Sequence, residues 1–203
     1  MTIAEELLLL AYDNEGRPAV TTTWLDPAIA AAVLAELVVR GRMELSGRKL
    51  SVRDPARLGE DELDAALALM GTRSRRPVSC IQLLERHGLR RRLLARLVTG
   101  GVLAETRGKA LGLFPVRRWP EARPGGRAEI RARVTAVLAG AEPDARTGTL
   151  VAILHADRYT RTFFPGYDDR RFKEVCEGGW AAEPVRRAVS VIADAALYAM
   201  AGE

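Results

Sequence analysis

Residues 27–40 read PAIAAAVLAELVVR, the longest stretch of continuous helical periodicity in the first third of the chain. Its larger apolar residues recur at the spacing of one helix face: Ile29, Val33, Leu34, Leu37 and Val38. Asp26 is a residue type favoured at the N-cap, and Pro27 suits the first position of a helix. Gly41 is typical of the residue that follows a helix. The stretch therefore predicts an amphipathic helix over residues 27–40.

Helical patterns continue through most of the remaining sequence. Thr2 and Glu5 have the spacing of a capping box and predict a short helix that carries the leucines of residues 7–10. Further helices are predicted over residues 63–70, 78–87, 89–98, 127–138, 146–155 and 184–200. Two β-hairpins are predicted over residues 43–52 and 102–114, with turns at residues 46–49 and 106–109. We expect a mainly α, single globular domain over residues 1–203, and residues 119–126 form the best candidate boundary loop.

The composition of the chain favours some classes of protein and excludes others. The chain has 203 residues, 31 basic and 26 acidic, with a formal net charge of +5, and its only lysines are Lys49, Lys109 and Lys173. Arginine binds carboxylates and phosphates through two parallel hydrogen bonds, so polyanions are natural partners. Two cysteines and two histidines exclude a disulfide framework and a histidine-rich metal site. No apolar run approaches the roughly 20 residues of a membrane span, and no signal peptide is evident, which predicts a soluble cytoplasmic protein.

An internal similarity appears at an offset of 60 residues. Residues 34–38 (LAELV) lead to Gly41, residues 94–98 (LARLV) lead to Gly101, and a predicted hairpin follows each. This order is typical of a winged helix-turn-helix module that binds DNA. It is also how any amphipathic helix ends and continues into a hairpin, and the pattern alone leaves both interpretations open.

Arg90 occupies an unusual position in the helix predicted over residues 89–98. At 100° per residue it falls in the middle of the apolar face, whereas Arg91, Arg92 and Arg96 fall on the solvent side. A buried arginine costs several kcal/mol unless it is paired or hydrogen-bonded. One explanation is an internal salt bridge, for example to Glu85. The other is an anion pocket at the start of the helix, where free N–H groups and the helix dipole favour negative charge.

Nothing in the sequence indicates catalysis. His155 and Asp157 are two residues apart and do not share a helix face. The acidic clusters at residues 60–62 and 168–169 lack the ligand pattern of a calcium loop. No serine-centred elbow, P-loop or dinucleotide-binding glycine pattern is present. We expect no enzymatic activity, no cofactor and no metal.

An ordered series of segments resembles the Golgi phosphoprotein 3 family, and most of all its bacterial branch. The segments are residues 5–16, 34–42, 97–103, 111–115 and 150–156. The resemblance runs from Ile3 to the C-terminus. It implies a central hydrophobic helix bundle surrounded by amphipathic helices, with a protruding hairpin. Eukaryotic members are non-enzymatic peripheral membrane proteins that bind phosphatidylinositol 4-phosphate and help to retain glycosyltransferases in the Golgi.

By this resemblance the chain is a non-catalytic adaptor that binds an anionic membrane lipid similar to phosphatidylinositol 4-phosphate. It is expected in the cytoplasm, peripherally associated with the inner face of the membrane, with no nucleic acid as partner. The alternative from another class is a winged-helix-like protein that binds nucleic acid.

The family's head-group pocket combines a tryptophan, an arginine on the first long helix and two arginines ahead of the hairpin. The resemblance assigns lipid head-group binding to Trp24, His87 and Arg90. Arg90 matches one arginine of the last pair, His87 replaces the other, and the helix arginine has become Ala30.

The family's hairpin contacts the membrane and supports self-association. The resemblance places it at residues 102–114 and assigns membrane contact to Leu103, Arg107, Lys109 and Leu111. A homo-oligomer formed through this hairpin follows as an expectation.

Overall fold

The apolar helix begins earlier than residue 27 and forms the centre of the domain. A computed structural model describes residues 1–110, 114–156 and 160–200, and in it helix α2 spans Thr22–Val39 with Pro27 inside the helix. The predicted start at Asp26 and Pro27 is therefore wrong. Trp24 and Leu25 are both buried, so the domain gains apolar contact by extending the helix beyond the proline towards the N-terminus.

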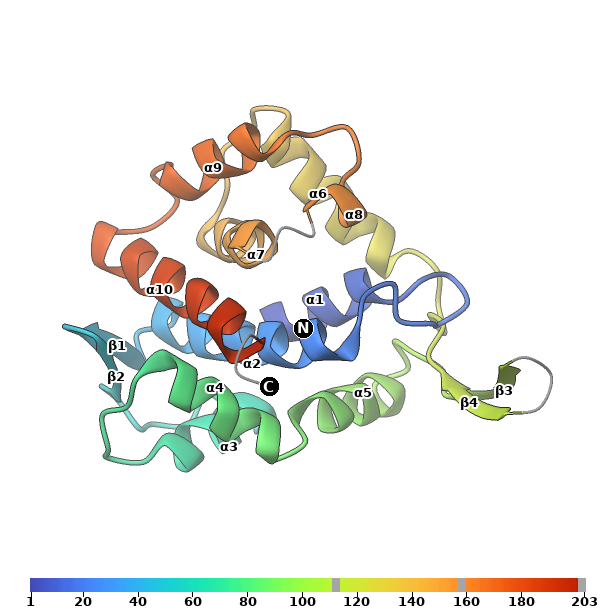
Figure 1. The fold of residues 1–203 in the computed structure, drawn as a ribbon, viewed down its shortest axis with the longest axis horizontal. Coiled ribbons are helices and arrows are strands. Elements are labelled where there is room, and N and C mark those ends of the chain that lie inside the picture. Colours follow the sequence, from blue (N-terminus) through green and yellow to red (C-terminus); the bar gives the residue numbers. More distant parts are fainter. Residues whose placement is uncertain (111–113, 157–159, 201–203) are drawn as a thin grey trace.

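Helix α2 is surrounded by other helices. It packs against α1 (Ile3–Ala11), α4 (Pro77–Arg86), α5 (Leu89–Thr99), α7 (Ala145–Ala156) and α10 (Glu183–Met200) (Figure 1). Its 18 residues have a mean hydropathy of 1.5, so by length and composition it would qualify as a membrane span, contrary to the prediction from the sequence. However, 78% of that window is buried inside the domain. A helix that is apolar on every side and enclosed by other helices is typical of a protein core.

The other elements complete a mainly α, single globular domain with two small hairpins, as predicted. The remaining helices are α3 (Asp61–Met70), α6 (Gly126–Leu138), α8 (Thr160–Phe163) and α9 (Asp169–Glu177). The last two were not predicted. Asp168, interpreted only as part of an acidic pair, is the N-cap of α9 and accepts a hydrogen bond from the Arg171 N–H at 3.0 Å.

The boundary loop at residues 119–126 is tied to the rest of the domain. The Trp119 N–H donates to the Gly16 carbonyl at 2.9 Å, and the Ala122 N–H donates to the Val102 carbonyl at 2.9 Å. Gly16 has a positive φ of 73°, and a Cβ there would overlap the Trp119 backbone. The loop therefore joins two parts of one packed structure.

The first hairpin is confirmed and the second is displaced. Strands β1 (Met43–Ser46) and β2 (Lys49–Val52) pair as predicted. Strand β3 spans Thr106–Ala110 and pairs with β4 (Phe114–Arg118), so Arg107 and Lys109 lie inside a strand and the predicted turn is wrong. Gly108 lies opposite Val116 and is covered by Arg118, whose Nε would be 2.9 Å from an added Cβ. This glycine accommodates a neighbouring side chain, and it does not form a turn.

Three carboxylates are buried where α1 lies on α2. The side chains of Glu5, Glu6 and Glu36 are 3% exposed or less. Glu5 accepts from the Thr2 N–H at 2.7 Å, which completes the predicted capping box. Glu36 of α2 accepts from the Ile3 N–H at 2.7 Å, so the start of α1 is held directly on the central helix.

Four arginines neutralise these carboxylates, three from surrounding helices and one, Arg40, from the end of α2 itself. Arg96 of α5 is 2.9 Å from Glu5, and Arg40 is 2.5 Å from Glu36. Glu6 contacts two arginines from different helices, Arg133 of α6 at 2.5 Å and Arg146 at 2.9 Å. Because a buried carboxylate without partners is very unfavourable, these pairs fix α5, α6 and α7 around α1.

Glu6→Gln is expected to lower the free energy of unfolding by about 1–3 kcal/mol, measured by urea denaturation. The change keeps the shape of the side chain and removes the charge that holds two helices. Glu129→Gln is the control, because Glu129 is exposed on α6. Its effect is expected to stay within about 0.5 kcal/mol. Equal effects of the two changes would show that the Glu6 pairs do not hold the helices.

Candidate head-group site at the α4–α5 junction

A left-handed glycine separates the two helices that carry the predicted head-group residues. Helix α4 ends with His87 as its C-cap, Gly88 has a φ of 65°, and α5 begins at Leu89. Only glycine adopts this conformation without strain, and it turns the chain so that α5 leaves in a new direction. Arg90 therefore lies in the first turn of α5, close to the end of α4.

Arg90 forms an ion pair with the central helix. Its Nε is 2.5 Å from Asp26 Oδ1, and the two side chains are 27% and 36% exposed. Of the two explanations for Arg90, the internal salt bridge is present, with Asp26 as partner. The guanidinium still reaches solvent.

The Tyr12 hydroxyl interacts with Arg90 beside this ion pair. Burial raises the pKa of the Tyr12 hydroxyl, and the neighbouring Arg90 opposes that shift. Burial opposes the charge on Arg90, but contacts with Asp26 and Tyr12 outweigh it and raise the pKa of Arg90. Arg90 therefore remains a cation, and Asp26 shares the position that a bound anion would take.

Trp24 and His87 lie differently with respect to solvent. Trp24 is 1% exposed, and its ring lies 5.7 Å from that of Phe163, so in this structure it packs in the core and presents no surface to a head group. His87 is exposed, and its Nδ1 lies 2.8 Å from the Leu83 carbonyl, which it can reach only as a donor. Ala30 is fully buried in α2. The structure thus brings His87 and Arg90 together near the surface and leaves Trp24 beneath it.

The other arginines of α5 are divided between ion pairs and solvent. Arg92 is 2.9 Å from Glu62 of α3, and Arg96 is paired with Glu5. Both side chains reach solvent as predicted, 35% and 37% exposed, but each is also tied to an acidic residue of α1 or α3. Arg91 remains exposed, as does Arg86 at the end of α4, and neither forms an ion pair with the residues described by the structure.

The hairpin residues are also separated by the structure. Leu103 is 2% exposed and forms an isolated β-bridge with Glu121, ahead of β3. A side chain buried in this way does not agree with the predicted membrane contact of Leu103. Arg107 is exposed and lies directly opposite Arg117, whose Nη1 is 3.1 Å from Glu105. Lys109 is described only as part of the β3 backbone, and Leu111 lies outside the described residues.

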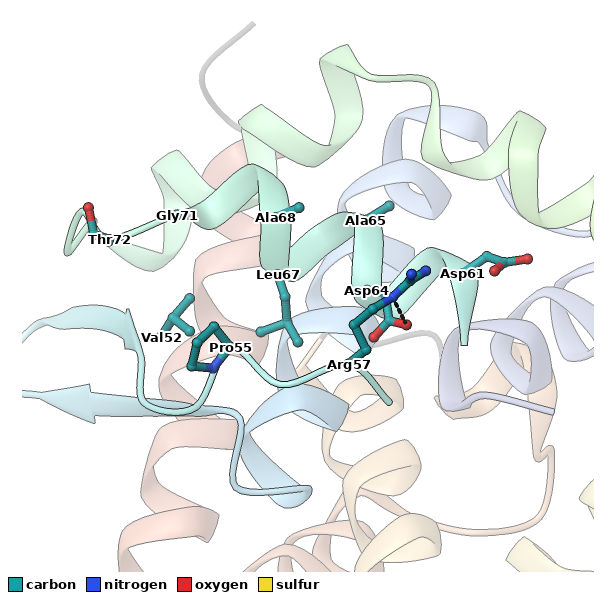
Figure 2. A pocket seen from close by; sticks show the side chains of 10 residues that line it. All are labelled: Val52, Pro55, Arg57, Asp61, Asp64, Ala65, Leu67, Ala68, Gly71 and Thr72. Atoms are coloured by element: carbon teal, nitrogen blue, oxygen red, sulfur yellow. Dashed lines mark hydrogen bonds and ion pairs between the residues drawn. The ribbon is translucent and has the colours of Figure 1, made fainter. Parts of the chain in front are cut away.

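A cleft of about 670 Å³ lies elsewhere, between α3 and the segment that follows β2. Figure 2 shows Arg57 reaching towards Asp64 beside an apolar wall formed by Val52, Pro55 and Leu67. Asp64 accepts from the Leu58 N–H at 2.7 Å and the Gly59 N–H at 3.1 Å. These backbone donors, together with Arg57, hold the pKa of the Asp64 carboxyl below its usual value. Asp64 thus serves to fold its own loop.

A family model described as Golgi phosphoprotein 3 (GPP34) matches residues 3–192 of the chain. The chain belongs to the Golgi phosphoprotein 3 family. It is also 29% identical over 187 residues to the vacuolar protein sorting-associated protein 74 of Eremothecium gossypii. That alignment covers 80% of this chain and 56% of the relative, so the chain spans little more than half of the relative's length.

Within this Golgi phosphoprotein 3 domain, the two helix–hairpin units are not equivalent. Helix α2 of the first unit is enclosed by other helices, so it does not present a face that enters a DNA groove. Helix α5 of the second unit uses Arg90, Arg92 and Arg96 in ion pairs. The structure therefore supports the second interpretation of the internal similarity, a helix that ends in a hairpin.

The two cysteines are not activated as nucleophiles. Burial raises the pKa of Cys80 to about 11 and that of Cys176 to about 12. Both are therefore protonated thiols at neutral pH. Among the described residues, no group of three or more histidine, cysteine or acidic side chains is placed to hold a metal ion.

Iodoacetamide is expected to label the folded chain roughly a hundredfold more slowly than a free thiol at neutral pH. Because both pKa values exceed 10, the labelling rate of the folded chain is expected to keep rising as the pH is raised to 10. The labelling rate of a free thiol no longer rises at that pH, because the thiol is already ionised. Mass spectrometry of each cysteine peptide measures the rates, and the urea-unfolded chain is the reference. Labelling of the folded chain as fast as this reference would contradict the assignment.

Proposed function

We propose that this chain is a non-catalytic, cytoplasmic peripheral membrane protein that binds anionic phospholipid head groups of the phosphatidylinositol 4-phosphate type. The head group binds at the α4–α5 junction, on the inner face of the membrane. Membership in the Golgi phosphoprotein 3 family supports this function. The family resemblance also supports an adaptor role and a homo-oligomer formed through the β3–β4 hairpin.

The observation that carries the proposal is a concentration of basic side chains at the junction. Arg86, His87 and Arg91 are exposed there, and Arg90 is partly exposed beside them. They surround the first turn of α5, where the N-terminal end of the helix dipole is positive. Each basic residue near an anionic membrane contributes about 1 kcal/mol of attraction. A phosphate at this junction meets several such groups at once.

Asp26 sets the strength of this site. A head-group phosphate that contacts Arg90 must share the guanidinium with Asp26 or displace it. This competition weakens binding, as does the replacement of the family's helix arginine by the buried Ala30. The site is therefore expected to bind anionic lipids as a class, with contributions from other basic surfaces.

Opposite effects are expected from changes to the two members of the ion pair. Arg90→Gln is expected to weaken binding to anionic vesicles about fivefold, because one cation near the surface is lost. Asp26→Asn is expected to strengthen binding by a similar factor, because the competing carboxylate is removed and the side-chain shape is kept. The measurement is co-sedimentation with phosphatidylcholine vesicles containing phosphatidylinositol 4-phosphate, phosphatidylinositol, phosphatidylglycerol or cardiolipin.

Arg123→Gln is the matched control for Arg90→Gln. Arg123 is exposed in the loop that follows β4, outside α4 and α5, and its loss changes the net charge equally. Circular dichroism verifies that each variant is folded. If Asp26→Asn and Arg90→Gln change binding in the same direction, or no more than the control does, the junction is not the head-group site.

The β3–β4 hairpin is expected to contribute through Arg107. Arg107→Glu is expected to weaken binding to anionic vesicles about tenfold, because an attraction is replaced by a repulsion. The hairpin itself is expected to remain folded, since the new carboxylate faces Arg117 and relieves a pair of like charges. Unchanged vesicle binding would remove the hairpin from the membrane interface. Light scattering on the same variant tests its part in self-association.

A further inference from the structure

A separate basic cleft lies at the opposite end of α4. It is formed where the turn of the β1–β2 hairpin, the start of α4 and one side of α10 meet (Figure 1). Its volume is about 450 Å³. This falls within the range of about 300–1,000 Å³ that is typical of small-ligand sites.

Three arginines from three different elements line this cleft. Arg48 comes from the hairpin turn, Arg76 is the N-cap of α4, and Arg187 comes from α10. All three are exposed, and none forms an ion pair or side-chain hydrogen bond with the residues described by the structure. They differ in this from Arg40, Arg90 and many other arginines of the chain, which have carboxylate partners.

The rest of the lining is largely apolar, with one aromatic edge. Pro77 and Ala195 are buried in the wall, with Val78 and Val191 beside them. Tyr198 is 72% exposed at the rim, the largest exposed aromatic surface among the described residues. Such a lining accommodates the carbon skeleton of a ligand whose charged groups contact the arginines.

Asp194 is the carboxylate among the lining residues. It forms no ion pair with the three arginines, although it borders the same cleft. It also borders a neighbouring cleft between α7, α9 and α10, together with His155. With three arginines and one aspartate, the lining has a formal charge of +2. A ligand with two negative charges would balance it.

We propose that this cleft is a second anion site, which binds a phosphate monoester or diphosphate carried by a small molecule or by a lipid head group. The arginine fork matches the geometry of phosphate oxygens, and three elements each contribute one fork to the lining. The start of α4 between Arg48 and Arg187 adds a favourable dipole. The site does not rest on the proposed function, because the ten residues of α4 place it about 15 Å from the α4–α5 junction.

Pyrophosphate is the first probe, in calorimetric titrations of the full chain at low salt. The double variant Arg76→Ala with Arg187→Ala is expected to bind pyrophosphate at least tenfold more weakly than the parent, because two charged hydrogen-bond donors are lost. Asp194→Asn is expected to bind it more tightly, because the opposing charge is removed. Arg123→Ala with Arg53→Ala is the control with equal loss of charge, since both arginines are exposed and outside the lining.

Vesicles distinguish the two sources of phosphate. The same variants are tested on phosphatidylcholine vesicles with and without phosphatidylinositol 4-phosphate. Weaker pyrophosphate binding by the double variant, with unchanged vesicle binding, supports the site with a soluble ligand. Weaker vesicle binding that exceeds the control supports it with a lipid ligand.

The proposal is overturned if neither probe separates the double variant from the control. It is also overturned if Asp194→Asn weakens pyrophosphate binding in a chain that circular dichroism shows to be folded. Arg90→Gln is expected to leave the pyrophosphate titration unchanged. The vesicle result for Arg90→Gln therefore tests the head-group site at the junction separately from this cleft.

Discussion

Buried carboxylates between α1 and α2 determine how the other helices are arranged. Each is removed from water by the apolar surroundings of the central helix, at a cost that only close cationic partners can offset. Three partners are long arginine side chains that begin on other helices, Arg96, Arg133 and Arg146, and the fourth is Arg40 at the end of α2 itself. Since the first three side chains reach inward from α5, α6 and α7 while remaining partly in water, the pairs act as fixed points around the core. The apolar core supplies most of the favourable free energy, and the pairs select one arrangement of its helices.

The same pairing explains the charge of the outer surface. Acidic residues such as Glu6, Glu36 and Asp64 are used inside the domain or in folding a loop, so they contribute little field outside it. The net charge of +5 therefore resides in arginines without carboxylate partners. Among the described residues, several of these lie at the two ends of α4 and on β3, and others, such as Arg53 and Arg123, lie elsewhere. A modest formal charge thus produces local basic surfaces of the kind that attract phosphates.

Local patterns in the sequence predicted the helices well and predicted their contacts poorly. The Thr2–Glu5 capping box and the β1–β2 turn depend on neighbouring residues, and both are confirmed. The start of α2 depends on the burial of Trp24 in a tertiary core, which outweighs the local signal of a proline. Gly108 was interpreted as part of a turn, because its contact with Arg118, ten residues away on β4, leaves no local signal in the sequence. For the candidate site, the position of Arg90 on the apolar face of its helix identified it as a paired or anion-binding residue. Its partner Asp26 lies 64 residues away in the sequence, and no local pattern connects the two.

The two ends of α4 differ in how much an anion must displace. At the α4–α5 junction, Asp26 is already paired with Arg90 at 2.5 Å. A phosphate that replaces Asp26 therefore gains only the difference between the two interaction energies with Arg90. In the cleft at the other end, Asp194 forms no ion pair with the three arginines, so an incoming phosphate displaces no carboxylate and meets Asp194 only as a neighbouring like charge. The three arginines of the cleft form no ion pair with the described residues, whereas at the junction Arg90 is paired and only the flanking Arg86 and Arg91 are not. A soluble phosphate therefore favours the cleft, whereas the junction depends on the added attraction of a membrane surface.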